Sequence, residues 1–184
     1  DPDIILVGEI RDEDTADMAF RAAMTGHQVL STLHTNSAVG TFPRLLDIGV
    51  LPDIMTGNII GVISQRLIRL LCPHCKSEKE PDEVESKLLD IEFESSKHKI
   101  FDAEGCSHCD NTGYKGRVAI IEALRINPEL DEGIAKRATL GELKTIAKQT
   151  GYKTLADDAV RCVLEGRTSL TEVSRVIDLT QRLI

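Results

Sequence analysis

The 184-residue sequence contains no tryptophan, and its few phenylalanine and tyrosine residues bring the aromatic content to only 3%. Acidic residues outnumber basic ones, 30 against 22, which gives a net charge of -8. Nucleic-acid-binding surfaces depend on basic grooves and on aromatic rings that stack with bases. The composition therefore excludes nucleic acid as a main partner.

Long apolar runs are absent as well. The longest, around residues 59–63, is interrupted by Gly61 and followed by Gln65 and Arg66. A transmembrane helix needs roughly 20 predominantly apolar residues, so we expect no transmembrane segment. With no targeting sequence and with cysteines expected to be reduced, the sequence indicates a cytoplasmic protein.

A phosphate-binding P-loop is also missing. Its pattern, Gly-x-x-x-x-Gly-Lys-Ser/Thr, requires a glycine followed by lysine, and none of the 13 glycines has lysine after it. The chain begins with Asp1 rather than methionine and enters an apolar strand pattern within six residues. We therefore interpret the sequence as a fragment of a larger protein.

Cysteines provide the clearest motif that is present. Four of the five form two Cys-x-x-Cys pairs, Cys72/Cys75 and Cys106/Cys109, separated by residues 76–105. Two such pairs can supply four thiolates to one tetrahedral Zn²⁺, which leaves no open position and therefore predicts a structural metal. The alternative is a disulfide framework, but Cys162 makes the count odd and there is no signal peptide.

The first 50 residues alternate between strand and helix patterns. The apolar run at 4–7 is typical of a buried parallel strand, and a second strand is expected at 27–33. Asp12 can cap a helix that Gly26 ends, and another helix is expected to end at Gly49. This alternation predicts an α/β unit with a parallel sheet.

Mixed patterns follow and give way to helices near the end. Strands are expected at 67–71 and 118–124, and the charged stretch 76–85 is expected to be a solvated loop. Capping residues, prolines and glycines predict a small helical bundle from about residue 128 onward. Helices are expected at 52–64, 84–91, 141–150, 155–165 and 173–179.

Two polar residues follow the first two predicted strands. Glu9 ends the first strand and His34 ends the second. The carboxyl ends of adjacent parallel strands border the ligand crevice in open α/β sheets, so we expect these side chains to lie close together. A carboxylate there can hold Mg²⁺ through water or orient an attacking water. The alternatives are an acid that only pairs with Arg11 and a histidine that only serves the turn.

Several segments, in the same order along the chain, resemble the type II secretion and type IV pilus assembly ATPases, hexameric motors with a RecA-like core. Residues 1–12 resemble their Walker B segment, with Gly-Glu in place of Asp-Glu. Residues 25–27 and 31–36 resemble their histidine box. Residues 65–67, both cysteine pairs and residues 112–117 resemble the zinc-bearing element of the assembly branch. The resemblance covers essentially the whole chain.

This resemblance implies roles for the candidate site residues. Glu9 would take part in Mg²⁺ and water positioning, His34 would sense or stabilise the terminal phosphate of ATP, and Arg11 and Asp12 would support the loop after Glu9. Cys72, Cys75, Cys106 and Cys109 would hold a structural Zn²⁺. ATP and Mg²⁺ would be cofactors of the full-length parent only, because the fragment lacks the P-loop and is expected to be inactive alone.

The same resemblance implies an organisation and partners. The expected fold class is α/β, with part of a RecA-like core at 1–70, a tetracysteine zinc-binding element at 71–117 and a mainly helical subdomain at 118–184. The parent would form a homo-hexamer, bind an inner-membrane platform protein and associate peripherally with that membrane. The cysteines favour assembly or secretion over pilus retraction, and pilus assembly, including adhesin-type pili, fits as well as type II secretion.

A zinc-stabilised protein-interaction module without enzymatic activity is the alternative function. Residues 106–113 resemble one repeat of a chaperone zinc domain, but such domains repeat the pattern several times, and the Cys72/Cys75 pair lacks the following Gly-x-Gly. A P-loop upstream in the parent reading frame would favour the motor, and its absence there would favour the module.

Overall fold

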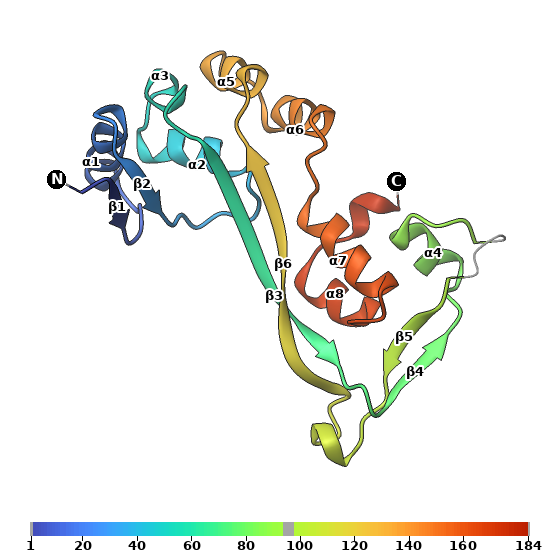
Figure 1. Cartoon of the computed structure of the whole chain (residues 1–184). Helices are drawn as coiled ribbons and strands as arrows, with labels where there is room; N and C mark the ends of the chain where they lie inside the picture. Colours follow the sequence, from blue (N-terminus) through green and yellow to red (C-terminus); the bar gives the residue numbers. More distant parts are fainter. Residues whose placement is uncertain (1, 94–97, 184) are drawn as a thin grey trace. The chain divides into compact units, whose positions relative to one another are not determined.

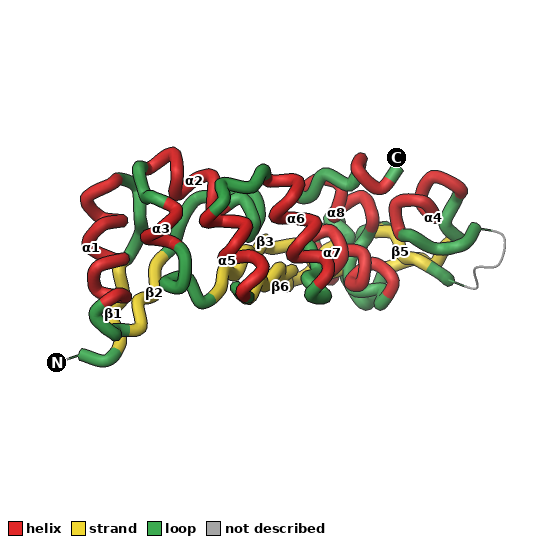
Figure 2. The backbone as a smooth tube through the Cα atoms, turned by 90° about the horizontal axis from the view of Figure 1, so that it is seen from above, coloured by secondary structure: helices red, strands yellow, loops and turns green. Residues whose placement is uncertain are grey.

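The computed structural model describes residues 2–93 and 98–183 and divides the chain into two compact units. Unit 1 comprises residues 1–64 and 122–152, and unit 2 comprises residues 65–121 and 153–184. Both units contain helices and strands, and the two longest described strands are β3 (Gly61–Leu71) and β6 (Tyr114–Arg125) (Figures 1 and 2). Asp1, the first residue of the predicted Walker B segment, lies outside the described residues. The division expected from the sequence, with a core part at 1–70, a zinc-binding element at 71–117 and a helical subdomain at 118–184, stays a prediction.

Unit 1 contains the predicted parallel strand pair. β1 (Ile4–Val7) pairs with β2 (Gln28–Ser31) in parallel, and α1 (Glu13–Met24) connects them. Asp12 caps α1 by accepting a 2.8 Å hydrogen bond from the Thr15 amide, and the helix ends before Gly26, whose φ of 97° suits glycine. The α/β expectation for this region is confirmed.

The next helices are shorter than the sequence suggested. α2 (Thr41–Ile48) ends at Gly49 as expected, but α3 (Pro52–Met55) is a single turn. The predicted helix 52–64 is therefore wrong beyond Met55. Residues 61–64 begin the long strand β3 (Gly61–Leu71), which pairs with β6 (Tyr114–Arg125). A Cβ on Gly61 would lie 3.1 Å from the Leu124 carbonyl oxygen, so glycine allows this close backbone approach.

Two capped helices complete unit 1. α5 (Pro128–Ala135) begins after Asn127, whose side chain accepts a 2.9 Å hydrogen bond from the Leu130 amide, and α6 (Leu140–Gln149) begins with a capping box at Thr139. The core of unit 1 joins these helices to α1, α2 and β6 through buried apolar side chains, including Phe20, Val39, Phe42, Leu45, Met55, Leu124, Leu130, Ile134 and Leu143.

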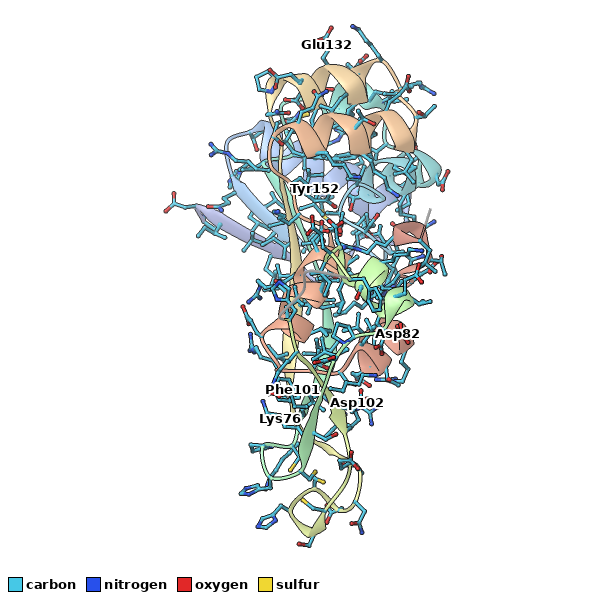
Figure 3. The ribbon with its side chains drawn as sticks, turned by 90° about the vertical axis from the view of Figure 1, so that its right-hand side faces the viewer. Lys76, Asp82, Phe101, Asp102, Glu132 and Tyr152 are labelled. Atoms are coloured by element: carbon cyan, nitrogen blue, oxygen red, sulfur yellow. The ribbon has the colours of Figure 1, made fainter. Side chains whose placement is uncertain are left out.

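Unit 2 contains an antiparallel strand pair that the sequence did not predict. β4 (Lys76–Lys79) pairs with β5 (Ile100–Ala103), so the expected solvated loop 76–85 is wrong at residues 76–79, and it is wrong again at residues 83–85, which begin a helix. The Lys76 ammonium lies 4.3 Å from the centre of the Phe101 ring and donates to the Gly166 carbonyl at 2.9 Å (Figure 3). The exposed Lys76 side chain thus connects β4 with Phe101 and Gly166 of the same unit. The predicted short helix is present as α4 (Glu83–Leu89).

The last helices of unit 2 pack as a pair. α7 (Leu155–Leu164) follows a capping box at Thr154, and α8 (Leu170–Val176) is capped by Ser169 and followed by the short 3₁₀ turn η2 (Thr180–Arg182). Cys162 is buried in the core, as expected for an apolar role. Other members of this core are Ile68, Leu89, Ile100, Ile120, Leu155, Val160, Val163, Leu170 and Val173. Within the described residues, none of the helices combines the length and apolarity that a membrane span requires.

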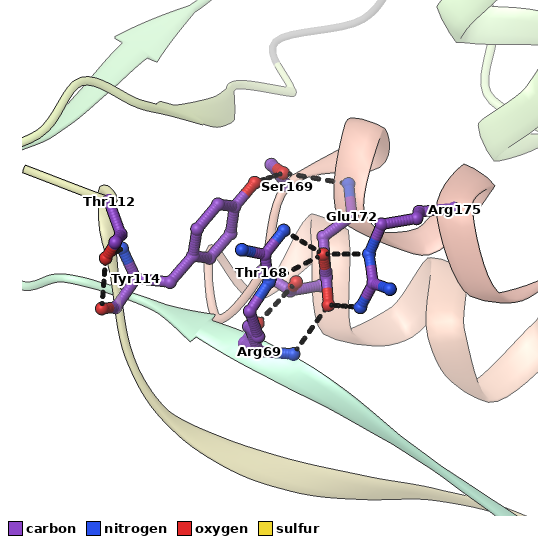
Figure 4. A network of polar contacts seen from close by, with 7 residues as sticks. All are labelled: Arg69, Thr112, Tyr114, Thr168, Ser169, Glu172 and Arg175. Carbon is purple, nitrogen blue, oxygen red and sulfur yellow. Dashed lines mark hydrogen bonds and ion pairs between the residues drawn. The ribbon is translucent and has the colours of Figure 1, made fainter.

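A buried acid joins α8 to β3 (Figure 4). The Glu172 carboxylate accepts hydrogen bonds from the Arg69 backbone amide at 3.0 Å, from Arg69 Nε at 2.9 Å and from Arg175 Nη2 at 2.8 Å. Nearby, the Arg69 guanidinium lies 4.1 Å from the centre of the Tyr114 ring, and the Tyr114 hydroxyl is 2.6 Å from Ser169 Oγ. Burial opposes ionisation, but the two arginines prevail and lower the pKa of Glu172 to about 2.

Candidate functional site

Glu9 and His34 meet at the carboxyl ends of the parallel strands of unit 1. Their segments are tied together by Thr32, whose hydroxyl donates to the Gly8 carbonyl at 2.8 Å and whose carbonyl accepts from the Ile10 amide at 2.9 Å. His34 Nε2 lies 2.6 Å from Glu9 Oε1, without the alignment of a hydrogen bond. The closeness expected from the topology is therefore present.

Arg11 sets the charge of this pair. Its Nη2 lies 2.5 Å from Glu9 Oε2, and this hydrogen bond holds the pKa of Glu9 below its ordinary value, while burial acts in the opposite direction. The Glu9 side chain is only 21% exposed, against 88% for His34. The arrangement offers an ionised, partly shielded carboxylate beside an accessible imidazole.

Two other sequence candidates lie apart from this contact. Asp12 caps α1 through Thr15. His27 lies at the opposite end of β2 from His34, and its Nδ1 is 3.1 Å from both the Ala22 carbonyl oxygen and Thr25 Oγ1 at the end of α1. Histidine near a helix C-terminus is a common stabilising arrangement.

Unit 2 brings the four motif cysteines together. All four sulfurs lie within 4.8 Å of one another, and the Cys72–Cys106, Cys75–Cys109 and Cys106–Cys109 sulfur distances are 3.9, 3.8 and 3.8 Å. Tetrahedral Zn²⁺ with Zn–S bonds of about 2.3 Å places its sulfurs about 3.8 Å apart. The cysteines are free thiols and not disulfides, so the disulfide alternative is wrong.

Backbone amides support two of these sulfurs. Cys109 Sγ accepts from the amides of Cys106 at 3.3 Å and Gly113 at 3.2 Å, and Cys75 Sγ accepts from the Gly105 amide at 3.3 Å. Burial opposes ionisation of Cys109, but these amides lower its pKa to about 6. Burial raises the pKa of Cys75 to about 12, so a bound cation is what would ionise this thiol at neutral pH.

Gly113 and two histidines surround the cysteine cluster. Gly113 has a φ of 75°, and a Cβ on it would lie 2.6 Å from the Ala103 Cβ, so no side chain fits there. The rings of His74 and His108 stack with their centres 4.1 Å apart, outside the four-sulfur group. His108 Nδ1 lies 3.9 Å from Cys106 Sγ, and the expectation that cysteine alone supplies the ligands stays a prediction.

Glu122 and Thr32 have structural roles that were not predicted from the sequence. Glu122 is 2% exposed and accepts a hydrogen bond from the Ala38 amide in the loop after His34. A signal was available, because Ile120, Glu122 and Leu124 alternate along a strand and so share one face. An acid between two apolar residues on that face indicates a buried carboxylate with a specific partner.

The fold and the two sites define an α/β protein that combines a parallel strand pair with a cluster of four cysteines that could hold a metal ion. Residues 1–175 match the family model described as "Type II/IV secretion system protein". The chain belongs to this family, which confirms the resemblance seen in the sequence.

Relatives in the family carry the names of pilus and secretion proteins. The chain is 48% identical over 181 residues to the type IV pilus assembly ATPase TfpB of Acinetobacter baylyi, covering 98% of this chain and 31% of that protein. It is 42% identical to the type II secretion system protein E of Pseudomonas aeruginosa, covering 96% of this chain and 35% of that protein. The chain thus spans about one third of the length of these relatives.

Solved structures give the same fold. The Legionella pneumophila ATPase DotB superposes with a TM-score of 0.61 at 21% identity, covering 95% of this chain and 38% of that chain. At this level of identity, the similarity concerns the fold alone.

Proposed function

We propose that this chain is the Walker B, histidine and zinc-bearing part of a motor ATPase for type IV pilus assembly, including adhesin-type pili, or for type II secretion. The family match and the names of the relatives support this proposal. The observation that carries it is the 2.6 Å approach of His34 to Glu9 at the ends of adjacent parallel strands.

In this proposal, Glu9 and His34 act on the nucleotide from neighbouring strand ends. Arg11 keeps the Glu9 carboxylate ionised, so that it can orient a water molecule or a water ligand of Mg²⁺. The exposed His34 ring can donate a hydrogen bond to a phosphate oxygen. Mg²⁺ bound to ATP would neutralise charge on the phosphates.

The parent protein supplies what this chain does not contain. No glycine here is followed by lysine, so the P-loop would come from another part of the parent, and the chain alone would neither bind ATP tightly nor hydrolyse it. The parent would work as a cytoplasmic homo-hexamer that docks on an inner-membrane platform protein.

Zn²⁺ would be a structural part of this machine. The four sulfurs match a closed tetrahedral site, which leaves no position for substrate. Cys72, Cys75, Cys106 and Cys109 would hold the ion and brace the turns that connect β3 with β4 and β5 with β6.

ATP hydrolysis by the P-loop-containing parent tests the catalytic proposal. Glu9→Gln and His34→Ala are each expected to lower kcat by about 10²-fold or more, because each removes a group placed at the reacting phosphate. His98→Ala is the matched control, since this exposed histidine belongs to unit 2 and to none of the segments that resemble the motor family. It should retain nearly full activity.

Full ATPase activity in both site variants would refute the proposed roles. A parent protein without a P-loop would instead support the zinc-stabilised interaction module.

A further inference from the structure

The loop that carries His34 runs from Thr32 to α2. The His34 side chain is 88% exposed, so packing does not determine where its ring lies. Its position depends on Glu9 and on how the backbone on either side is fixed. Thr32 fixes the start of the loop, through its hydrogen bonds to Gly8 and Ile10.

Glu122 fixes the other end of the His34 loop, at Ala38. Its carboxylate comes from β6, far along the chain, and accepts a hydrogen bond from the Ala38 amide. Ala38 and Val39 are fully buried in the core of unit 1, and the Ala38 carbonyl accepts from the Thr41 amide at 3.2 Å as α2 begins. Leu33 packs against the same core, so residues 34–37, with His34 first among them, lie between two fixed points of the backbone.

Packing does not explain why an acid occupies position 122. Ile120 and Leu124, the neighbours of Glu122 on the buried face of β6, are 0% and 2% exposed. Burying a carboxylate is unfavourable unless it is hydrogen-bonded, and an apolar residue would fill the same space without that penalty. Charge-assisted bonds to backbone amides are among the stronger hydrogen bonds, which suits an anchor.

We propose that Glu122 is a positioning residue that holds the His34 loop so that the imidazole stays beside Glu9. The catalytic meaning of that position rests on the function proposed above. The anchor itself is a property of this chain and is measurable without nucleotide. If the Glu122 carboxylate only stabilised the start of α2, its removal would leave the position of the His34 ring unchanged.

The ring ¹⁵N chemical shifts of His34 in the 184-residue chain provide the test. Glu9→Ala defines the shifts of a His34 ring that has lost its partner. Glu122→Leu keeps the core filled but removes the acceptor, and is expected to move the His34 shifts most of the way to that reference. Glu122→Gln retains an acceptor oxygen and is expected to restore shifts close to the wild-type values.

Leu124→Ala is the matched control, because Leu124 is a buried residue on the same face of β6 but has no carboxylate that could bond the Ala38 amide. It should lower stability and leave the His34 shifts in place. Should Glu122→Leu not fold, Glu122→Asp gives the same readout, since the shorter side chain keeps the charge but does not reach Ala38.

Wild-type His34 shifts in folded Glu122→Leu or Glu122→Asp would overturn the proposal, as would equal changes in Leu124→Ala. Failure of the Glu122 proposal is distinguishable from failure of the proposed function. An unchanged ATPase rate in His34→Ala would refute the catalytic role, while the shift measurement would still report whether Glu122 holds the loop.

Discussion

Each unit of this chain contains a buried glutamate that is hydrogen-bonded to a segment far away in the sequence. Glu122 in unit 1 accepts a backbone amide, whereas Glu172 in unit 2 accepts from two guanidinium groups and a backbone amide. A buried acid is destabilising without such donors, and it therefore favours the one geometry that supplies them. These two residues therefore matter more to the native structure than the exposed ion pairs, which contribute little.

Glu172 is expected to give the chain an acid-sensitive stability. Its pKa in the folded state is about 2, below the ordinary 4.5, so its contribution is present above pH 4.5 and is lost as the pH falls toward 2. A shift of this size corresponds to about 3 kcal/mol in the free energy of unfolding. Urea unfolding of the wild type and of Glu172→Gln between pH 2 and 6 measures it.

The variant should lose about 3 kcal/mol at pH 6 and have a flatter pH dependence than the wild type. Glu83→Gln is the control, because Glu83 is 66% exposed in its pair with Lys87 and its loss should change stability by less than about 0.5 kcal/mol. Parallel pH curves for wild type and Glu172→Gln would contradict this role for Glu172.

At the residue scale, the contacts that depend on local motifs could be predicted from the sequence. The four cysteines have a fixed spacing, and Glu9 and His34 follow recognisable strands, so their meeting points could be anticipated. The catalytic roles of Glu9 and His34 stay predictions. The pairing of Glu122 with the Ala38 amide and that of Glu172 with Arg69 could not be anticipated, because each joins segments far apart in the sequence.

At the element scale, helix starts and the parallel pairing of β1 with β2 were predictable, and the pairing of the other strands was not. Asp12, Asn127 and Ser169 cap their helices through bonds to amides three residues ahead, an interaction that a short window of sequence contains. By contrast, residues 61–64 and 76–79 become strands only because β6 and β5 pair with them. Their local composition, glycine-bearing in one case and charged in the other, favoured other structures.

The cysteine element is expected to bind one Zn²⁺ per chain and to depend on it for stability. The double variant Cys72→Ser/Cys75→Ser should lose the metal and at least about 3 kcal/mol of stability, because metal binding and folding are coupled. Elemental analysis and thermal unfolding measure the two quantities. Cys162→Ala is the matched control, since Cys162 is buried outside the cluster and its variant should keep full zinc content.

Unchanged stability together with full zinc content in the double variant would refute this account of the element. Loss of zinc in Cys162→Ala would show that core packing, and not the four sulfurs, controls metal binding.

At the scale of the whole molecule, the part of the chain that the structure describes forms two hydrophobic cores and one cysteine cluster that could hold a metal ion. One core belongs to unit 1 and the other to unit 2, and all four cluster cysteines lie in unit 2. Each core also contains helices from the C-terminal third of the chain, α5 and α6 in unit 1 and α7 and α8 in unit 2. The units therefore have separate sources of stability.

Metal removal should distinguish the two units. Hydrogen exchange of the zinc-loaded chain, measured by mass spectrometry with and without a chelator, is expected to accelerate in residues 65–121 and 153–183. Peptides of unit 1, such as those from α1 and α5, should change little because the Phe42 and Leu130 core contains no ligand. The Cys72→Ser/Cys75→Ser variant without chelator should show the same pattern, which separates metal loss from other effects of the chelator. Equal acceleration in both units would mean that the metal stabilises the whole chain as one cooperative structure, contrary to this expectation.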